Sequence, residues 1–231
     1  MKIAYIFHGH SRTWQQTHES FFENVFSVAP GDIFIHTWGD CINPKISAPW
    51  NGWTTLNENQ LAISSTKPDI NGIFQTYKPK IMIVEEDPGP DITLLPEEFR
   101  SDLRSPGNVG VKNMLRSART IFEAATKYKK YDKIFNTRLD IKYNSKLTEI
   151  EILSDKLLSP PSFGHIELWM FGTTEQIDKK TNFVNHIDKY WYHNPQYLEV
   201  AYELTFITYM LDQGIPVNSA SNLQYEIIRP F

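Results

Sequence analysis

Asn136, Arg138 and Asp140 are the residues of this chain best suited to do chemistry. They lie in the stretch 131–143, whose β-branched and aromatic residues predict a strand. Because side chains alternate across a strand, the three polar groups project to one side and mostly apolar neighbours to the other. Burying an amide, a guanidinium and a carboxylate together is costly unless they meet a ligand or a metal ion. This stretch therefore predicts a binding site at the edge of a sheet.

Polar residues also end the first predicted strand. Residues 2–8 form an apolar run that predicts a strand buried on both faces, and it ends in His8-Gly9-His10-Ser11-Arg12. Gly9 would let the backbone approach a ligand closely, and Arg12 could pair with a phosphate. The alternative is that this segment only makes a turn and caps the following helix.

A second strand is predicted over residues 32–38, and it contains His36 and Trp38. In open α/β sheets, ligands bind beyond the carboxyl ends of the strands. We therefore expect His36 and Trp38 to share one pocket with the segments 8–12 and 136–140. The alternative for His36 is a core histidine whose hydrogen bonds are satisfied within the protein.

The elements that must position these groups alternate between strands and helices, which is typical of βαβ units and a parallel sheet. The sequence predicts one α/β domain with a mostly parallel, twisted sheet flanked by helices. Gly214 is expected to end the last helix. The other expected elements are helices over 17–28, 111–128, 178–187 and 195–213, and strands over 80–86, 157–158 and 166–171.

Two long segments, 39–72 and 88–107, are polar or acidic and contain many prolines and glycines. The first carries Trp50 and Trp53 and is expected to hold at most one short helix, near 57–63. Long loops in compact domains often close over ligands. We expect one or both of these segments to become ordered on ligand binding, with the two tryptophans covering or stacking on the ligand.

Bulk composition narrows the class of protein. The chain has 231 residues, a net charge of −4 and a pI near 6.0, which argue against nucleic-acid binding. No apolar run is long enough to span a bilayer, and Cys41 is the only cysteine, so an internal disulfide is impossible. We therefore expect a soluble cytoplasmic protein. The sequence lacks the P-loop, dinucleotide-binding and serine-hydrolase motifs.

Several segments occur in an order found in a known family. They are Gly9-x-x-Arg12 with its flanking residues 6–14, Asp-Ile-Phe-Ile-His-Thr-Trp at 32–38, Tyr131-Asp132 followed by Arg138 and Asp140, Glu167 ahead of Phe171-Gly172, and Glu203 ahead of Gly214-Ile215. In these landmarks the chain resembles the bacterial surface-polysaccharide glycosyltransferases of the GT-A type. The 32–38 strand and the Arg138-x-Asp140 pair are the specific parts of the resemblance.

The resemblance implies a GT-A-like fold and transfer of a sugar from a nucleoside-diphosphate donor to a saccharide or lipid-linked saccharide acceptor. Residues 1–143 would form the donor-binding half and 144–231 the acceptor side. The protein would act in capsule or lipopolysaccharide synthesis, in the cytoplasm, with at most peripheral contact with the inner face of the membrane. The implied donor-binding residues are His8, Gly9, Arg12, His36, Trp38, Asn136 and Arg138.

In the family that the chain resembles, an Asp-x-Asp element holds a divalent metal ion, usually Mn²⁺ or Mg²⁺, against the donor diphosphate. Such ions prefer oxygen ligands, and the metal neutralises charge that builds on the leaving group. This chain has Arg138-Leu139-Asp140 in that position, with one carboxylate. We expect Asp140 to hold the metal together with phosphate oxygens and water. The alternative is that Arg138 supplies the positive charge and no metal is needed.

An inverting transfer also needs a base that takes the proton of the acceptor hydroxyl. Glu167 and Glu203 are the candidates, because each is an acid among apolar neighbours in the C-terminal half. Partial desolvation of a carboxylate raises its pKa and favours a functional role. The alternatives are a solvent-facing strand residue for Glu167 and a salt-bridged helix residue for Glu203. The base would be unnecessary if the transfer retained configuration.

A second hypothesis is a non-catalytic α/β module that binds nucleotides or saccharides in a polysaccharide assembly system. The missing first carboxylate and the short chain favour it, whereas the polar strand ends favour the enzyme. A phosphate-ester hydrolase is a distant third reading, because the sequence shows no clear paired-carboxylate or histidine cluster.

Overall fold

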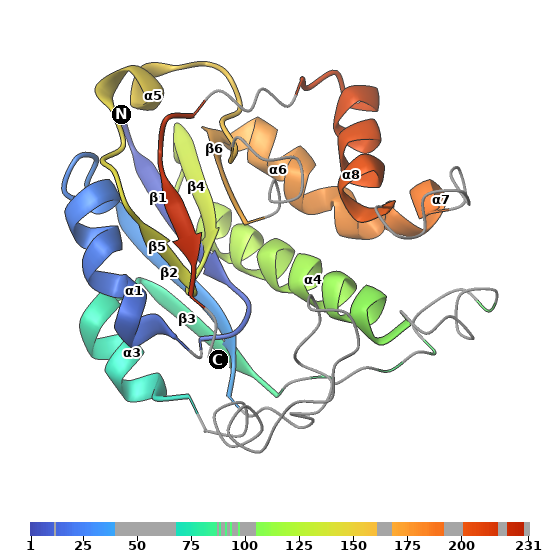
Figure 1. The fold of residues 1–231 in the computed structure, drawn as a ribbon, viewed down its shortest axis with the longest axis horizontal. Coiled ribbons are helices and arrows are strands. Elements are labelled where there is room, and N and C mark those ends of the chain that lie inside the picture. The colour runs from blue at the N-terminus through green and yellow to red at the C-terminus, as the bar shows by residue number, and fades with distance from the viewer. Residues whose placement is uncertain are drawn as a thin grey trace.

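The computed structural model describes residues 1–11, 13–39, 68–86, 105–160, 168–191, 201–216 and 221–228, with positions 88, 91, 93 and 97; the side chains of 105–109, 191 and 201–204 lie outside this description. Within these residues the main sheet has five strands in the order β3-β2-β1-β4-β6 (Figure 1). Strands β1 (Ile3–His8), β2 (Asp32–Trp38), β3 (Ile81–Glu85) and β4 (Lys133–Arg138) are parallel, and β6 (Trp169–Thr173) runs antiparallel to β4. This mixed, mostly parallel sheet confirms the α/β prediction.

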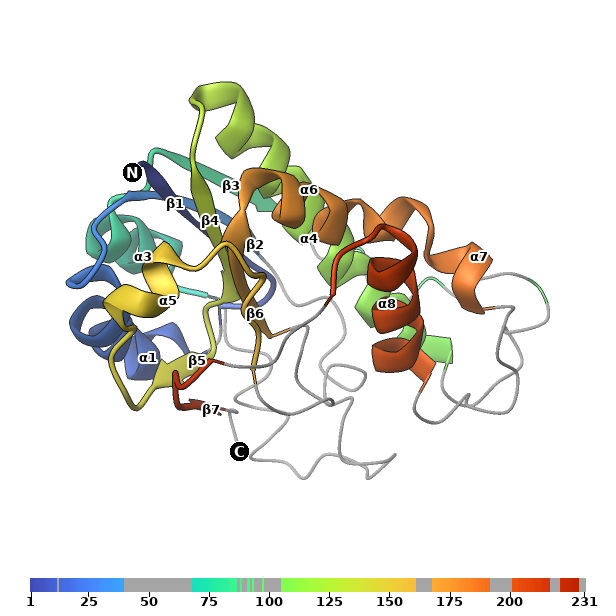
Figure 2. The ribbon, with the colours of Figure 1, turned by 90° about the horizontal axis from the view of Figure 1, so that it is seen from above.

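The sheet separates two layers of helices, as Figure 2 shows. One face is covered by α1 (Trp14–Phe21), which continues as the π-helix η1 (Phe22–Phe26), and by α3 (Ile70–Tyr77). The other is covered by α4 (Ser105–Tyr128) and α6 (Thr174–Asn182). Beyond α6 lie η6 (Phe183–Asn185), α7 (Ile187–Trp191) and α8 (Ala201–Asp212).

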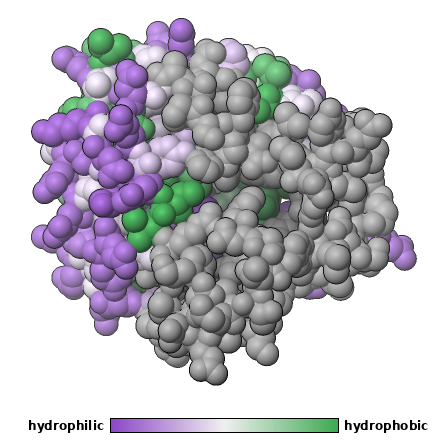
Figure 3. All heavy atoms as spheres, in the orientation of Figure 1, coloured by the Kyte–Doolittle hydropathy of each residue, from purple (hydrophilic) through white to green (hydrophobic). Residues whose placement is uncertain are grey.

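The hydrophobic core follows the same division. Ala4, Ile6 and Ile134 of the sheet pack with the apolar faces of α4, α6 and α8, whereas Tyr5 and Phe135 pack with α1 and α3. The central strands are therefore buried on both faces, which explains their nearly continuous apolar sequences. The outer surface on the side of α1 is hydrophilic (Figure 3).

The predicted strand over 131–143 is wrong as a continuous element. The chain turns at Leu139 and Asp140 and enters a second, two-stranded sheet made of β5 (Ile141–Tyr143) and β7 (Tyr225–Ile227). Two distant groups hold this turn. The hydroxyl of Thr17 donates to the carbonyl of Leu139 at 2.6 Å, and the backbone N–H of Ile228 donates to the carbonyl of Asp140 at 2.8 Å. The backbone polar groups of the turn are thereby satisfied outside the main sheet.

Other boundaries also differ from the sequence-based expectations. The helix predicted over 17–28 begins at Trp14, and that predicted over 178–187 begins at Thr174, after a capping box of Thr173 and Gln176. The strand predicted at 157–158 is a single bridge from Leu158 to Phe171. Helices α3 and α5 (Glu149–Leu153) were not expected. The short helix expected near 57–63 and the start of that expected over 195–213 lie outside the described residues.

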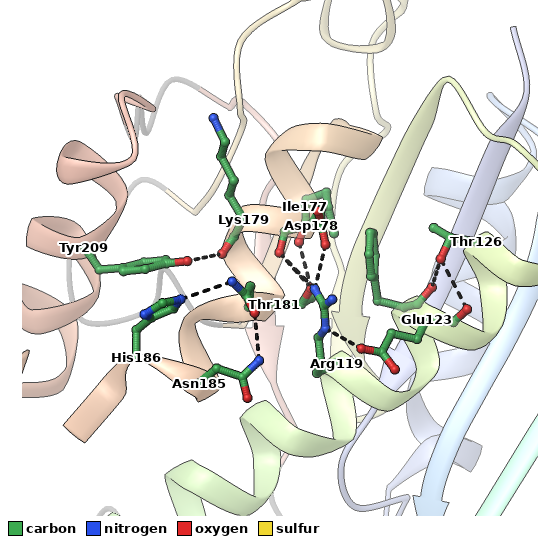
Figure 4. Close-up of polar contacts among 12 residues, drawn as sticks. Arg119, Glu123, Thr126, Ile177, Asp178, Lys179, Thr181, Asn185, His186 and Tyr209 are labelled. Carbon is green, nitrogen blue, oxygen red and sulfur yellow. Dashed lines mark hydrogen bonds and ion pairs between the residues drawn. The ribbon is translucent and has the colours of Figure 1, made fainter. Parts of the chain in front are cut away.

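Polar contacts orient α6 on α4 (Figure 4). Arg119 of α4 donates from Nε to Glu123 at 2.8 Å and from Nη1 to Asp178 Oδ1 at 2.6 Å. The same Nη1 lies 3.4 Å from the hydroxyl of Thr181. The bonds to Asp178 and Thr181 join α4 to α6, and the buried positions of α6, which include Thr181, lie on its inner side.

Candidate functional site

Four of the residues singled out by the sequence lie together on the sheet face covered by α4 and α6. The strand register pairs His8 with Arg138 and Ile6 with Asn136, and it places His36 beside His8 on the neighbouring strand. His36, His8 and Arg138 therefore form a row across three parallel strands at their carboxyl ends. Asn136 lies one pleat earlier on the same face, diagonal to His8.

His8 is buried with 1% of its surface exposed, and neither ring nitrogen has a hydrogen-bond partner in the described structure. Burial lowers the pKa of this imidazole well below its usual value of 6.5, and the nearby charges of Lys180 and Arg138, together with His36, lower it further. The ring is therefore neutral at pH 7 and offers one N–H donor and one acceptor nitrogen. A buried imidazole that makes neither of these hydrogen bonds is energetically costly unless a ligand or a water molecule supplies the missing partners.

Lys180 was missed by the sequence-based reasoning. It projects from α6 toward the sheet, is 1% exposed, and donates from Nζ to Oδ1 of Asn136. Because an ammonium only donates, this contact also assigns the amide orientation of Asn136. The Asn136 Nδ2 group is buried and has no hydrogen-bond partner among the described residues. Ile177, Lys180 and Thr181 are the buried positions of α6, and their i, i+3, i+4 spacing was the available signal.

Ser117 of α4 was also missed, and it joins the two histidine strands. Its hydroxyl oxygen accepts the backbone N–H of Gly9 at 3.1 Å and lies 2.6 Å from Nδ1 of His36. The Nε2 atom of His36 lies 3.2 Å from Oε2 of Glu85, off the line of a hydrogen bond. The carboxylate favours a proton on Nε2, so the Ser117 hydroxyl donates to Nδ1. Burial lowers the pKa of His36, although Glu85 acts in the opposite direction.

Gly9 and Trp38 shape the turn that follows β1. Gly9 has a φ of +91°, a backbone conformation that favours glycine, while an added Cβ would lie at an ordinary 3.9 Å from Trp38. The backbone conformation, rather than a lack of room for a side chain, therefore explains why glycine occupies this position. The ring of Trp38 is buried, and its centre lies 4.7 Å from that of His10 and 5.8 Å from that of His36.

Asp140 lies in the turn after β4, where it pairs with Arg138. Nε of Arg138 donates to Oδ1 of Asp140 at 2.9 Å, and Nη2 donates to Oδ2. Both carboxylate oxygens are thus engaged by one guanidinium. The described part of the chain contains no group of three or more metal-ligating residues. These contacts do not fit a metal ion held by Asp140, because an ion there would compete with the arginine for both oxygens.

Three predicted site residues cannot be placed with these groups. Arg12 and Glu167 lie outside the described residues, as do Trp50 and Trp53 of the first long loop. Glu203 belongs to α8, and its side chain is outside the description. The assignments of Arg12 to the donor and of Glu167 or Glu203 to the base stay predictions.

Comparison with known proteins adds no family. No protein-family model matches the chain, and no curated protein matches it. No helix in the described ranges is both long enough and apolar enough to cross a bilayer.

The arrangement is suited to binding an anion that also carries hydroxyl groups. Lys180 and Arg138 supply positive charge, and neutral His8 and the Asn136 amide supply directional hydrogen bonds at the same sheet edge. Charged donors bind phosphate and carboxylate oxygens more strongly than neutral donors do. Such a ligand would supply hydrogen-bond partners for the buried nitrogens of His8 and Asn136 that lack them in the described structure.

Proposed function

We propose that the chain is a glycosyltransferase that moves a sugar from a nucleoside-diphosphate donor to a glycan acceptor in bacterial surface-polysaccharide synthesis. The observation that carries the proposal is the row formed by the buried His36 and His8 and the partly exposed Arg138 at the carboxyl ends of parallel strands. A sheet edge of this kind is the usual ligand site of open α/β folds. The resemblance of the 32–38 and 138–140 segments to GT-A enzymes is the reason for proposing a sugar nucleotide as the ligand.

Charge at the sheet edge supports a diphosphate as the bound group. The donor's leaving group gains negative charge during transfer, and preorganised cations in a desolvated site stabilise that charge. Lys180 is such a cation within the described structure, and Arg138, which is partly exposed and paired with Asp140, lies at the same edge. In this proposal the sugar lies beyond the diphosphate, on the acceptor side of the molecule. A GT-A arrangement of the sheet is part of the proposal.

The divalent metal remains a separate prediction. If Mn²⁺ or Mg²⁺ takes part, a metal ion bound to the donor phosphates would need protein ligands besides the Asp140 carboxylate. Both oxygens of that carboxylate accept hydrogen bonds from Arg138. The Glu167 or Glu203 carboxylate would then take the acceptor's proton in an inverting transfer.

A second candidate is a module that binds a nucleotide or saccharide without turnover. The Arg138–Asp140 pair is the specific observation that favours it, because the carboxylate of Asp140 is already neutralised by its neighbour Arg138. Both candidates predict donor binding, and only the enzyme predicts slow release of nucleoside diphosphate.

A thermal-shift screen of nucleotides and sugar nucleotides, with Mn²⁺ and with EDTA, tests the binding that both candidates share. A ligand that binds only the folded state raises the melting temperature by mass action, equivalent to about 2.7 kcal/mol at a hundred times its Kd. We expect a nucleoside diphosphate or one of its sugar conjugates to raise it. A screen in which no nucleotide or sugar nucleotide shifts the transition would contradict the proposed ligand class.

A further inference from the structure

Lys180 extends the site beyond the residues that the sequence singled out. It is almost fully buried, and it reaches from α6 across to Asn136 on β4. A lysine on the inner side of a helix is unusual, because burial of an ammonium is costly unless several groups solvate it. The Arg119 contacts with Asp178 and Thr181 hold α6 in the orientation that directs Lys180 to the sheet.

The neighbours of Lys180 form a receptor for oxygen atoms. His8 has two buried ring nitrogens without bonds, and Asn136 has a buried amide nitrogen without bonds in the described structure. His8 and Asn136 occupy diagonal positions on adjacent strands, about 8 Å apart between their Cα atoms from ordinary sheet spacings. Their side chains lie on the face of the sheet that α4 and α6 cover. Oxygens placed between them would meet N–H donors from both residues.

We propose that His8, Asn136 and Lys180 form a phosphate-binding subsite in which the Lys180 ammonium does the work of a divalent metal. The proposal names the residues that take the diphosphate of the donor, and it rests on the proposed function for the identity of that donor. Positive charge selects an anionic oxygen, and the neutral His8 ring adds one donor together with one acceptor for a hydroxyl. The engagement of both Asp140 oxygens by Arg138 is the reason for assigning the charge to Lys180.

Binding of inorganic pyrophosphate in EDTA, measured by isothermal titration calorimetry, tests this subsite without any nucleotide. We expect the parent protein to bind pyrophosphate and Lys180→Met to bind it at least tenfold more weakly, because charge-assisted bonds are lost. Lys179→Met is the matched control. Lys179 is the next residue of α6, points away from Arg119 (Figure 4), and is bonded to the carbonyl of Gln213 at 3.3 Å. Its replacement should change the affinity less than twofold.

Asn136→Asp provides a second variant that does not depend on removing the lysine. A carboxylate at this position would pair with Lys180, so the melting temperature should be kept or raised. The same carboxylate would repel pyrophosphate and lower its affinity at least tenfold. A purely structural role for the Lys180–Asn136 contact predicts that pyrophosphate affinity stays unchanged in this variant, whatever the effect on the melting temperature.

The proposal is overturned if the parent does not bind pyrophosphate in EDTA at millimolar concentration. It is also overturned if Lys180→Met or Asn136→Asp binds pyrophosphate as tightly as the parent, or if Lys179→Met loses as much affinity as Lys180→Met.

Sugar-nucleotide turnover separates this result from the proposed function. Lys180-dependent pyrophosphate binding without turnover of any donor would contradict the enzyme and leave the subsite standing. Turnover of a donor by the parent, with an unchanged donor KM in Lys180→Met, would support the enzyme and contradict the subsite.

Discussion

Arg138 and Asp140 bind each other across the turn that ends β4, with Nε of Arg138 2.9 Å from Oδ1 of Asp140 and Nη2 bonded to Oδ2. The two side chains are 21% and 15% exposed, so the pair lies at the border between the core and solvent. The carboxylate that sequence analysis assigned to a metal therefore orients a cation. A metal ion held by Asp140 would have to compete with Arg138 for both carboxylate oxygens, and participation of a divalent metal stays a prediction.

Asp140→Asn tests the role of this pair. We expect turnover to fall by roughly two to four decades, because an amide cannot hold the guanidinium in place through two charged bonds. The free energy of unfolding should fall by about 1 kcal/mol, a value reduced by partial exposure of the pair. Donor turnover and urea unfolding measure the two effects. Unchanged turnover would remove Asp140 from the mechanism.

Ser117→Ala should destabilise the sheet edge. The change leaves the N–H of Gly9 and Nδ1 of His36 without their shared partner, and loss of a buried hydrogen-bond partner costs about 1–3 kcal/mol. Ser27→Ala is a suitable control, because the Ser27 hydroxyl bonds only a nearby helical carbonyl at an exposed position. We expect the control to change the unfolding free energy by less than about 0.5 kcal/mol. Equal effects of the two changes in urea unfolding would argue against the bridge.

The depressed pKa values of His8 and His36 predict a loss of stability in mild acid. The unfolded chain takes up protons near the usual value of 6.5, whereas the folded protein takes them up only at lower pH. Stability is therefore complete above about pH 7.5 and falls below pH 6.5, by up to about 1.4 kcal/mol per pH unit for each histidine. Asp32 and Glu151 also have lowered pKa values, but from usual values of 3.8 and 4.5, below this window.

Urea unfolding at pH 7.5, 6.5 and 5.5, repeated with His8→Leu, measures this effect. The variant should lose less stability between pH 7.5 and 5.5 than the parent, with the remaining loss due to His36, whose pKa is lowered by burial and by Arg116 and raised by Glu85. Identical pH dependence in the two proteins would show that His8 titrates normally.

Much of the fold could be predicted from the sequence because local pattern and tertiary environment agree there. The strand over 32–38 was predicted at its observed bounds, since an apolar run in a central parallel strand is buried on both faces. The βαβ order is confirmed for the same reason, as is the end of α8 just before Gly214, which has a φ of +72°. In each case residues adjacent in sequence carried the signal.

The turn at Leu139 and Asp140 could not be predicted in this way. Its carbonyls are bonded by Thr17 and by Ile228, which lie 122 and 88 positions away along the chain, so no local pattern marks the break. Ser117 was hidden in an amphipathic helix for a similar reason. Lys180 was different, because its place between Ile177 and Thr181 on the buried side of α6 was visible in the helical spacing.

Glu167→Gln and Glu203→Gln test the two candidate bases. The correct residue should depress turnover by roughly two to four decades with donor affinity preserved, because a base contributes to proton transfer rather than to ground-state binding. Turnover and donor Kd should be measured for each variant. Two fully active variants would exclude both residues as the base, and a loss confined to acceptor binding would favour a retaining transfer.

Release of nucleoside diphosphate from a panel of sugar nucleotides, without acceptor and in both Mn²⁺ and EDTA, tests the central claim most directly. A glycosyltransferase with its donor bound transfers the sugar slowly to water. The proposal predicts measurable release from at least one donor by the parent, strongly reduced in His8→Leu and Asp140→Asn, and unchanged in the surface control Lys179→Met. Binding of a sugar nucleotide with no release of nucleoside diphosphate in either condition would contradict the enzyme and support the non-catalytic binding module.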